Sequence, residues 1–363
     1  MRAETPPTDI PNNSQPSTNT SLDPRLETLR QWLSTHTASY RLDLSGLAPA
    51  SNDASFRRYF RLPSHTHGSL IVMDAPPHQE DCHPFVKVAA LFAAAGVNVP
   101  HVLEQDFQQG FLLLTDLGQS TYLERLTPTT APQLYGAASA ALIQIQTHSR
   151  PDVLPAYDRP LLLREMNLFP EWYLNQHLQL TLSPTQHTEL QQVFDAILAN
   201  NLAQPTVWVH RDYHSRNLMV VDEVRNNPGT NPGILDFQDA VYGPITYDLV
   251  SLLRDAYIEW PEEQVLDWVI RHWEKARQVG LPVAADVSEF YRDFEWMGLQ
   301  RFLKVLGIFA RLAHRDGKQR YLDDLPVVLR YTRHVAERYG ALKPLLKLLD
   351  AAENKAAQVG YTF

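Results

Sequence analysis

Several polar side chains that could take part in catalysis fall within one short stretch, 210–217 (HRDYHSRN), which lies between two apolar runs. Another carboxylate, Asp236, follows the apolar residues 233–235. This spacing suits phosphoryl transfer, in which a loop aspartate orients the attacking hydroxyl and accepts its proton, while an asparagine and a second aspartate hold Mg²⁺ on the phosphates. We therefore predict Asp212, Asn217 and Asp236 as catalytic residues, and the last two as the metal ligands.

Two histidines share this stretch with Asp212, and a cluster of His, His and Asp is also typical of metal sites with nitrogen ligands. The asparagine and the downstream aspartate favour magnesium, because Mg²⁺ takes a few oxygen ligands and completes its shell with water and substrate phosphates. We interpret His210 as a hydrogen-bonded scaffold residue. His214 is either merely exposed or a contact to the substrate.

The size and composition of the chain limit its possible functions. Its 363 residues exceed the size at which a single core usually stops growing, which favours two packed lobes with a cleft between them. Acidic residues outnumber basic ones, 41 to 32, and no run of Lys and Arg can follow a phosphate backbone, so nucleic acid is not an expected partner. No stretch approaches the ~20 apolar residues of a membrane span. The single cysteine, Cys82, fits a reducing cytoplasm, where we expect the protein.

The domain organisation follows from composition and from one helix start. Residues 1–22 are rich in Thr, Pro, Asn and Ser, which predicts a disordered tail rather than a signal peptide. Asp23 and Pro24 are typical of the cap and first turn of a helix, so the fold is predicted to begin there. We expect a nucleotide-binding lobe at 23–116 and a catalytic and substrate-binding lobe at 117–363.

The predicted elements differ between the two lobes. Up to about residue 116 the sequence favours strands around a helix, and after it helical periodicity dominates. Strands are predicted at 56–62, 69–73, 101–105, 111–115, 206–209, 218–221 and 233–236. Helices are predicted at 84–95, 131–147, 164–177, 184–200, 246–257, 262–278, 286–313 and 326–338. The predicted fold class is α+β, with a small antiparallel sheet in the first lobe and a larger helical second lobe.

Together with the loop at 210–217, five further stretches carry a resemblance to a known superfamily. They are 53–61 (DASFRRYFR), 73–77 (MDAPP), 111–118 (FLLLTDLG), 236–244 (DFQDAVYGP) and 247–249 (YDL). The chain resembles the aminoglycoside phosphotransferase and choline kinase-like superfamily, and within it the bacterial anomeric N-acetylmuramate/N-acetylglucosamine kinases. The resemblance implies a bilobal protein-kinase-like fold that uses ATP and Mg²⁺. It also implies phosphorylation of the C1 hydroxyl of N-acetylmuramic acid or N-acetylglucosamine, which gives a sugar 1-phosphate for peptidoglycan recycling.

The nucleotide side departs from the protein-kinase pattern in two places. There is no G-x-G-x-x-G between the first two strands of the small lobe, and Ser51, Asn52 and Ser55 are expected to cover the phosphates instead. The third-strand lysine that contacts the α- and β-phosphates is also missing, since 70–75 reads LIVMDA. Another cation must replace this lysine, or nucleotide binding is weak.

Arg57, Arg58 and Arg61 are the candidate cations, and solvated strand charges are the alternative interpretation. Side chains alternate along a strand, so Arg57 and Arg61 share one face and Arg58 lies on the other. The sequence does not indicate which of these faces meets the cleft. Lys87 of the following helix could also reach inward, although a surface role is expected for it. We expect Thr115, Asp116 and Leu117 at the hinge between the lobes, where backbone groups can meet the edge of an adenine.

Acceptor recognition is expected in the large lobe, where aromatic faces pack on sugar C–H surfaces and polar groups meet hydroxyls or an acetamide. The candidate residues are Glu165, Glu171, Trp172, His214, Arg216, Asp239 and Trp296. For the aromatic members, core packing is the alternative.

Two alternative functions stay open, a kinase for another small alcohol such as an aminoglycoside, choline or homoserine, and a nucleotide-binding pseudokinase. The sequence indicates neither the preferred sugar nor the oligomeric state.

Overall fold

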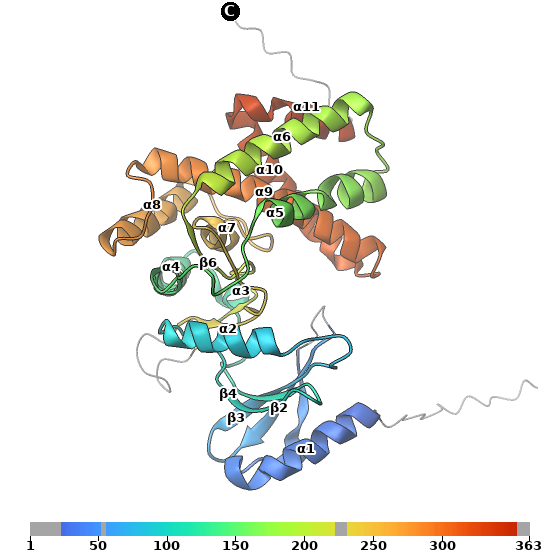
Figure 1. Cartoon of the computed structure of the whole chain (residues 1–363), viewed down its shortest axis with the longest axis vertical. Helices are drawn as coiled ribbons and strands as arrows, with labels where there is room; N and C mark the ends of the chain where they lie inside the picture. Colours follow the sequence, from blue (N-terminus) through green and yellow to red (C-terminus); the bar gives the residue numbers. More distant parts are fainter. Residues whose placement is uncertain (1–22, 52–55, 222–230, 354–363) are drawn as a thin grey trace, which may run out of the picture.

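The computed structural model of the protein describes residues 23–51, 56–221 and 231–353. It consists of a five-stranded antiparallel sheet with a helix on each face and a larger helical part that follows it in the chain. Figure 1 shows α2 (His83–Ala94) between the sheet and the helical part, and its apolar residues belong to the core that continues into the helices. The predicted α+β fold class is confirmed.

The sheet has the strand order β1-β2-β3-β5-β4. Its strands are β1 (Ala48–Ser51), β2 (Arg58–Ser64), β3 (Gly68–Asp74), β4 (Val102–Asp106) and β5 (Phe111–Thr115). Along β3, Leu70 and Val72 pack with Leu29 of α1 (Pro24–Tyr40), whereas Met73 belongs to the core that contains Phe85 of α2. Burial on both faces fixes the register, because a slip by one residue would exchange the two faces.

Charged residues attach α1 to the sheet. The carboxylate of Asp23 caps the helix by accepting the backbone N–H of Arg25 at 3.0 Å, and Pro24 occupies the first turn, as predicted. Asp74, at the end of β3, is fully buried. It pairs with Arg25 at 2.6 Å and with Arg58 of β2 at 2.5 Å, so the buried carboxylate is neutralised from both elements.

The helical part is arranged around α9 (Val287–His314), which is buried along most of its length. The other α-helices are α3 (Tyr122–Arg125), α4 (Ala131–Thr147), α5 (Arg159–Met166), α6 (Pro184–Ala203), α7 (Tyr247–Leu253), α8 (Glu262–Gln278), α10 (Leu325–Arg338) and α11 (Lys343–Ala352). Short 3₁₀ helices in the chain are Leu44–Gly46, Gln319–Asp324 and Gly340–Leu342. Two antiparallel pairs of strands complete this part: β6 (Thr206–Val209) with β9 (Val241–Pro244), and β7 (Leu218–Met219) with β8 (Gly233–Ile234). Within the described ranges, no helix has both the length and the apolar character needed to span a membrane.

The single helix predicted at 164–177 is wrong, because α5 ends at Met166 and a π-helix, η2 (Phe169–His177), follows it. Pro170 has no N–H to donate, so it interrupts the α-helical series of hydrogen bonds. The segment packs closely on α9 at Gly307, where a Cβ would lie 2.4 Å from the backbone of Leu168. The missing side chain at Gly307 therefore permits this approach.

The sequence analysis missed β1, β9, α3 and α11. Strand β9 reads Val-Tyr-Gly-Pro, a composition that is more typical of a turn. It forms a strand because β6 pairs with it, with Val207 opposite Gly243 and Trp208 opposite Tyr242. Tertiary contacts thus override the local preference.

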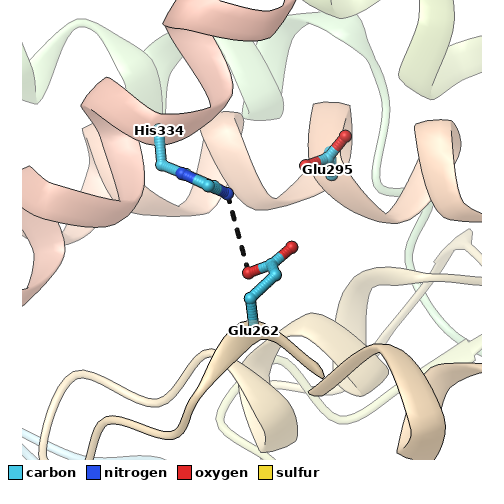
Figure 2. A group of neighbouring side chains, drawn as sticks. All are labelled: Glu262, Glu295 and His334. Carbon is cyan, nitrogen blue, oxygen red and sulfur yellow. Dashed lines mark ion pairs between the residues drawn. The ribbon is translucent and has the colours of Figure 1, made fainter. Parts of the chain in front are cut away.

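An ion-pair network joins α8, α9 and α10. Figure 2 shows Glu262 directed toward His334, with Glu295 on the neighbouring helix, and one potential ligand atom from each lies within 4.8 Å of the others. Arg338 donates to Glu295 at 2.5 Å and to Glu262 at 3.1 Å, and Arg254 also binds Glu262. Because arginines already occupy these carboxylates, we interpret the cluster as a structural network and not as a metal site.

Replacing Glu262 with Gln is expected to destabilise the fold at pH 7 by about 1–3 kcal/mol, because charge-assisted hydrogen bonds are lost. Burial raises the pKa of Glu262, but hydrogen bonds from Tyr291 and Arg254 and nearby arginine charges outweigh burial and lower it from 4.5 to about 2. The ionised form therefore stabilises the fold above pH 4.5, and this contribution is lost as the pH falls toward 2. Urea unfolding of the parent and of Glu262→Gln gives the free energy of unfolding of each protein. The difference between these two free energies should shrink as the pH falls from 4.5 toward 2.

The matched control is Glu263→Gln, which changes the exposed neighbouring carboxylate on α8. This variant should stay within about 0.5 kcal/mol of the parent. If the free energies of unfolding of Glu262→Gln and the parent differ by the same amount at every pH, the stabilising role of the ionised Glu262 carboxylate is contradicted.

Candidate active site

The β7–β8 hairpin brings the three predicted catalytic residues together. The loop 210–217 connects β6 to β7, and Asp236 follows β8. The backbone N–H of Leu235 donates to the carbonyl of Asn217 at 2.9 Å. The side-chain nitrogen of Asn217 then donates to the carbonyl of Asp212 at 3.0 Å and to the carboxylate of Asp236 at 3.3 Å.

Two buried aspartates hold this loop, and each is 1% exposed. Asp248 of α7 accepts the backbone N–H groups of His210 at 2.7 Å and Arg211 at 3.0 Å. Asp255, just after α7, accepts the backbone N–H of Ser215 at 3.0 Å and also its hydroxyl. Sequence analysis missed both roles, because a lone aspartate in an apolar helical run carries no signal of the loop that it binds.

His210 is a scaffold residue, as predicted. The side chain is fully buried, its Nε2 lies 2.9 Å from the carbonyl of Leu235, and its Nδ1 accepts the backbone N–H of Asp212 at 3.2 Å. Burial lowers the pKa of His210 to about 4. The hydrogen bonds therefore assign a neutral ring with its proton on Nε2, which links the loop to the segment that carries Asp236.

Two site residues adopt a left-handed backbone that only glycine adopts readily. Arg211 has a φ of 79° and Asp236 a φ of 62°. Such conformations cost about 1–3 kcal/mol each and persist where the surroundings hold them. Asp248 holds Arg211, and Gln238 donates to the carboxylate of Asp236 at 2.8 Å. Phe237, fully buried with ring centroids 4.8 Å from Phe85 of α2, anchors the next residue.

Glu165 of α5 lies at the centre of a buried polar network. Its carboxylate is bound by Lys304 at 3.1 Å, by Gln300 at 3.2 Å, and also by Arg211 and the hydroxyl of Tyr157. Burial raises the pKa of Glu165, but the charges of Lys304 and Arg211 lower it further, so the group stays ionised. These donors occupy both carboxylate oxygens.

The environment of Asp212 keeps this group charged. Burial raises the pKa of Asp212, but the charge of Lys304, followed by those of His214, Arg211 and Arg301, outweighs burial and places the pKa below its usual value. A carboxylate ionised at neutral pH can orient a hydroxyl and accept its proton.

His214 and Arg216 lie on the other half of the loop. His214 is half-buried rather than exposed, and its ring meets that of Tyr257 edge-on at 5.5 Å. The guanidinium of Arg216 lies over the same ring at 3.5 Å. The loop therefore presents both side chains around one aromatic ring.

The structure places the two candidate cations on different faces of the sheet. Arg58 lies on the α1 face, where Asp74 and Asp23 bind it. Arg57 binds Glu80 at 2.9 Å. Burial lowers the pKa of Arg57, but the nearby charges, among them that of Asp236, outweigh burial and raise it, so Arg57 lies within electrostatic reach of a predicted metal ligand.

The remaining predicted nucleotide contacts lie at two places. At the predicted hinge, the carboxylate of Asp116 binds Arg61 at 2.6 Å and the hydroxyl of Ser69 at 2.6 Å. Leu117 packs on Gly233, where a Cβ would lie 3.0 Å from the leucine side chain. The hydroxyl of Thr115 accepts the backbone N–H of His101 at 2.9 Å, which connects the end of β5 to the turn before β4. Asn52, Ser55 and the side chain of Ser51 lie outside the described residues.

The other predicted acceptor contacts are less closely connected to the loop. Asp239 is exposed, and its carbonyl lies 3.4 Å from a guanidinium nitrogen of Arg211. Glu171 is exposed, Trp172 is half-buried, and Trp296 is buried with its ring edge-on to another aromatic ring. Within the described ranges, these last three make no hydrogen bond or ion pair with the loop 210–217.

The donor set at Asn217 and Asp236 fits a hard divalent cation. Both side chains offer oxygen, which is the donor that Mg²⁺ prefers. The Nδ2 of Asn217 is used within the site, so its Oδ1 is the atom available to a cation. Beside them, the buried Oε1 of Gln238 has no hydrogen-bond partner among the described residues, so it can accept from water in the shell of a bound cation.

Comparison with known proteins identifies similar sequences over almost the whole chain. Residues 46–282 match the model of a phosphotransferase enzyme family. The chain is 48% identical over 340 residues to an N-acetylmuramate/N-acetylglucosamine kinase of Neisseria meningitidis serogroup B, which covers 92% of this chain and 98% of the relative. It is 50% identical over 303 residues to a protein of the same name from Pseudomonas aeruginosa, which covers 84% and 87% of the two chains.

Solved structures show the same fold at low sequence identity. A choline/ethanolamine kinase family protein from Mesorhizobium loti matches with a TM-score of 0.59 and 16% identity, over 90% of this chain and 99% of the other. An amicoumacin kinase, in complex with AMP-PNP and Ca²⁺, matches with a TM-score of 0.56 and 14% identity, over 87% and 97%. The predicted protein-kinase-like fold is thereby confirmed.

Replacing Asp248 with Asn is expected to loosen the first half of the loop, because an amide can accept only through one atom and turns its NH₂ group toward a backbone donor. Burial raises the pKa of Asp248 to about 7, so the experiment is done above pH 8, where the carboxylate is ionised. Loss of one charge-assisted hydrogen bond then corresponds to about a 10- to 100-fold faster opening of the loop. Hydrogen–deuterium exchange of the 207–213 peptide should accelerate by this factor. Asp267→Asn, on the exposed part of α8, is the control. Unchanged exchange in the Asp248 variant would contradict the role of this carboxylate.

Proposed function

Because this chain belongs to the phosphotransferase enzyme family, we propose that it transfers the terminal phosphate of ATP to the C1 hydroxyl of N-acetylmuramate or N-acetylglucosamine. The identity of 48% to a kinase with these two sugars in its name, over 92% of this chain, carries the proposal for the acceptor. The product would be a sugar 1-phosphate for peptidoglycan recycling. The buried free Cys82 and the use of ATP favour the cytoplasm as its location.

In the proposed reaction, Asp212 orients the C1 hydroxyl and takes up its proton. The hydroxyl oxygen forms a bond to the γ-phosphorus, the bond from this phosphorus to the β–γ bridging oxygen breaks, and ADP leaves. An anomeric hydroxyl is more acidic than an ordinary alcohol, so a carboxylate with a low pKa suffices as the base. Mg²⁺, held by Asn217 and Asp236, would neutralise the phosphate charge.

Arg57 is the cation that we propose in place of the missing lysine. It is 10% exposed, Glu80 fixes its guanidinium at 2.9 Å, and its charge acts on Asp236. Strand β3 supplies no cation, and Asp74 at its end faces α1 and carries two arginines. A guanidinium next to the metal ligands suits the α- and β-phosphates. Arg58 would instead stabilise the attachment of α1.

The nucleotide base would bind at the hinge. The carboxylate of Asp116 is already bound by Arg61 and Ser69, so contacts to adenine fall to the backbone of Thr115, Asp116 and Leu117. In this proposal, residues 23–116 form the nucleotide-binding lobe and residues 117–363 form the acceptor lobe. Glu165 acts through Arg211 and Lys304 as a positioning residue, because its oxygens are already bound.

Purified protein with Mg²⁺ and ATP is expected to phosphorylate N-acetylmuramate and N-acetylglucosamine but not the 1-O-methyl glycoside of the latter, which lacks a free C1 hydroxyl. Choline and an aminoglycoside serve as alternative acceptors, and ³¹P NMR of the product identifies the phosphorylated position. Turnover of the methyl glycoside would contradict an exclusively anomeric acceptor. Turnover of no acceptor would favour a pseudokinase. Asp212→Ala is the control for the mechanism, since it should lose nearly all turnover and still bind ATP.

Replacing Arg57 with Met is expected to raise the KM for ATP about 10- to 100-fold, because the phosphates lose a charge-assisted contact. Arg57→Lys should recover part of this loss. Arg58→Met, which removes the neighbouring charge on the opposite face, should lower the free energy of unfolding and leave the KM for ATP unchanged. The reverse pattern would assign the phosphate contact to Arg58.

A further inference from the structure

Arg301 of α9 is an almost completely buried residue whose guanidinium has no direct partner in the described parts of the chain. The residue is only 4% exposed. Among the described residues, its side chain makes no hydrogen bond and no ion pair. Other buried cations of the helical part are bound directly, such as Lys304 to Glu165 and Arg254 to Glu262. An unpaired buried charge costs free energy, which a ligand of opposite charge can offset.

The position of Arg301 points to the acceptor side of the loop. Residues three apart on a helix share a face, so Arg301 lies beside Lys304, which binds the Glu165 carboxylate that also holds Arg211. The charge of Arg301 contributes to the low pKa of Asp212 and of His214. The guanidinium therefore lies near the base that receives the acceptor proton.

A second unsatisfied polar group lies in the same region. The Nδ1 atom of His214 is buried and has no hydrogen-bond partner among the described residues. The ring of Tyr257 lies beside this histidine, and it is also close enough to Arg301 for the cation to affect its pKa. A buried cation, an orphaned histidine nitrogen and an aromatic ring next to Asp212 form a set that suits a polar, anionic sugar.

We propose that Arg301 binds the carboxylate of N-acetylmuramate and so determines how well this sugar competes with N-acetylglucosamine. The inference rests on the proposed function. N-Acetylmuramate is N-acetylglucosamine with a lactyl ether on O3, and the carboxylate of this ether is the only charge that distinguishes the two. A guanidinium offers two parallel N–H donors to a carboxylate, which makes it the side chain best suited to this recognition.

The opposing explanation is that Arg301 only balances the negative charge of nearby Asp212, where it helps to outweigh burial and lower the pKa. A balancing role affects both sugars alike, because both use the same base. A role in recognition affects only the sugar with the carboxylate.

The test compares steady-state kinetics of both sugars in the parent protein and in Arg301→Gln. We expect kcat/KM for N-acetylmuramate to fall about 10- to 100-fold more than that for N-acetylglucosamine, chiefly through KM, because any loss that arises at Asp212 is shared by both sugars. Arg301→Lys should retain part of the preference, since it keeps the charge without the planar fork. Arg292→Gln, on the exposed side of α9, is the matched control and should change neither value.

A substrate analogue tests the same contact in the parent protein, where no variant can misfold. The methyl ester of N-acetylmuramate lacks the charge, so the parent should prefer the acid to the ester by a factor that Arg301→Gln abolishes. An equal loss for both sugars, or a preference for the acid that survives in the variant, would overturn the inference. If the parent phosphorylates neither sugar, the proposed function itself fails; if it phosphorylates both, these ratios decide on Arg301 alone.

Discussion

The carboxylate of Asp248 accepts two consecutive backbone N–H groups of the loop, and the geometry of the site depends on this interaction. It holds Arg211 in a left-handed conformation and thereby sets the direction in which the chain enters Asp212. Asp255 holds the other half of the loop, and the hairpin hydrogen bond at Asn217 brings in Asp236. Backbone contacts therefore position the three predicted catalytic residues, and the hydrogen bond from Asn217 to the carboxylate of Asp236 adds a direct contact between two of them.

The position of the loop also determines which charges surround Asp212 and therefore its ionised state. The loop places the carboxylate of Asp212 in a half-buried position, and charges from α9 and from the loop itself keep it ionised. Glu165 prevents an excess of positive charge by binding both Arg211 and Lys304. Burial, neighbouring charge and hydrogen bonding thus act in opposite directions on the same group, and the cations dominate. On the side proposed for the nucleotide, Arg57 and Glu80 form a comparable pair, and the charge of Asp236 acts on this arginine.

The parts of the site that are contiguous in sequence could be predicted, and the parts that depend on distant partners could not. The loop at 210–217 and Asp236 carry a recognisable spacing, and the helix at 131–147 was predicted with the bounds that the structure has. The partners of the loop escaped prediction, because Asp248 and Asp255 lie 37 to 40 residues away from the groups that they bind. The faces of Arg57 and Arg58 required the sheet, whose register decides which of them meets Asp74.

Asp74 has a wider consequence for how proteins of this type are classified. The third strand contains no lysine, and it ends in a buried acid that two arginines neutralise from the α1 side. A survey that separates active from inactive kinases by a lysine at this strand would place this chain among the inactive ones. The electrostatic requirement for a cation at the phosphates concerns its location in space and not its place in the alignment. A reliable criterion would ask which basic side chain reaches the metal ligands, from any strand.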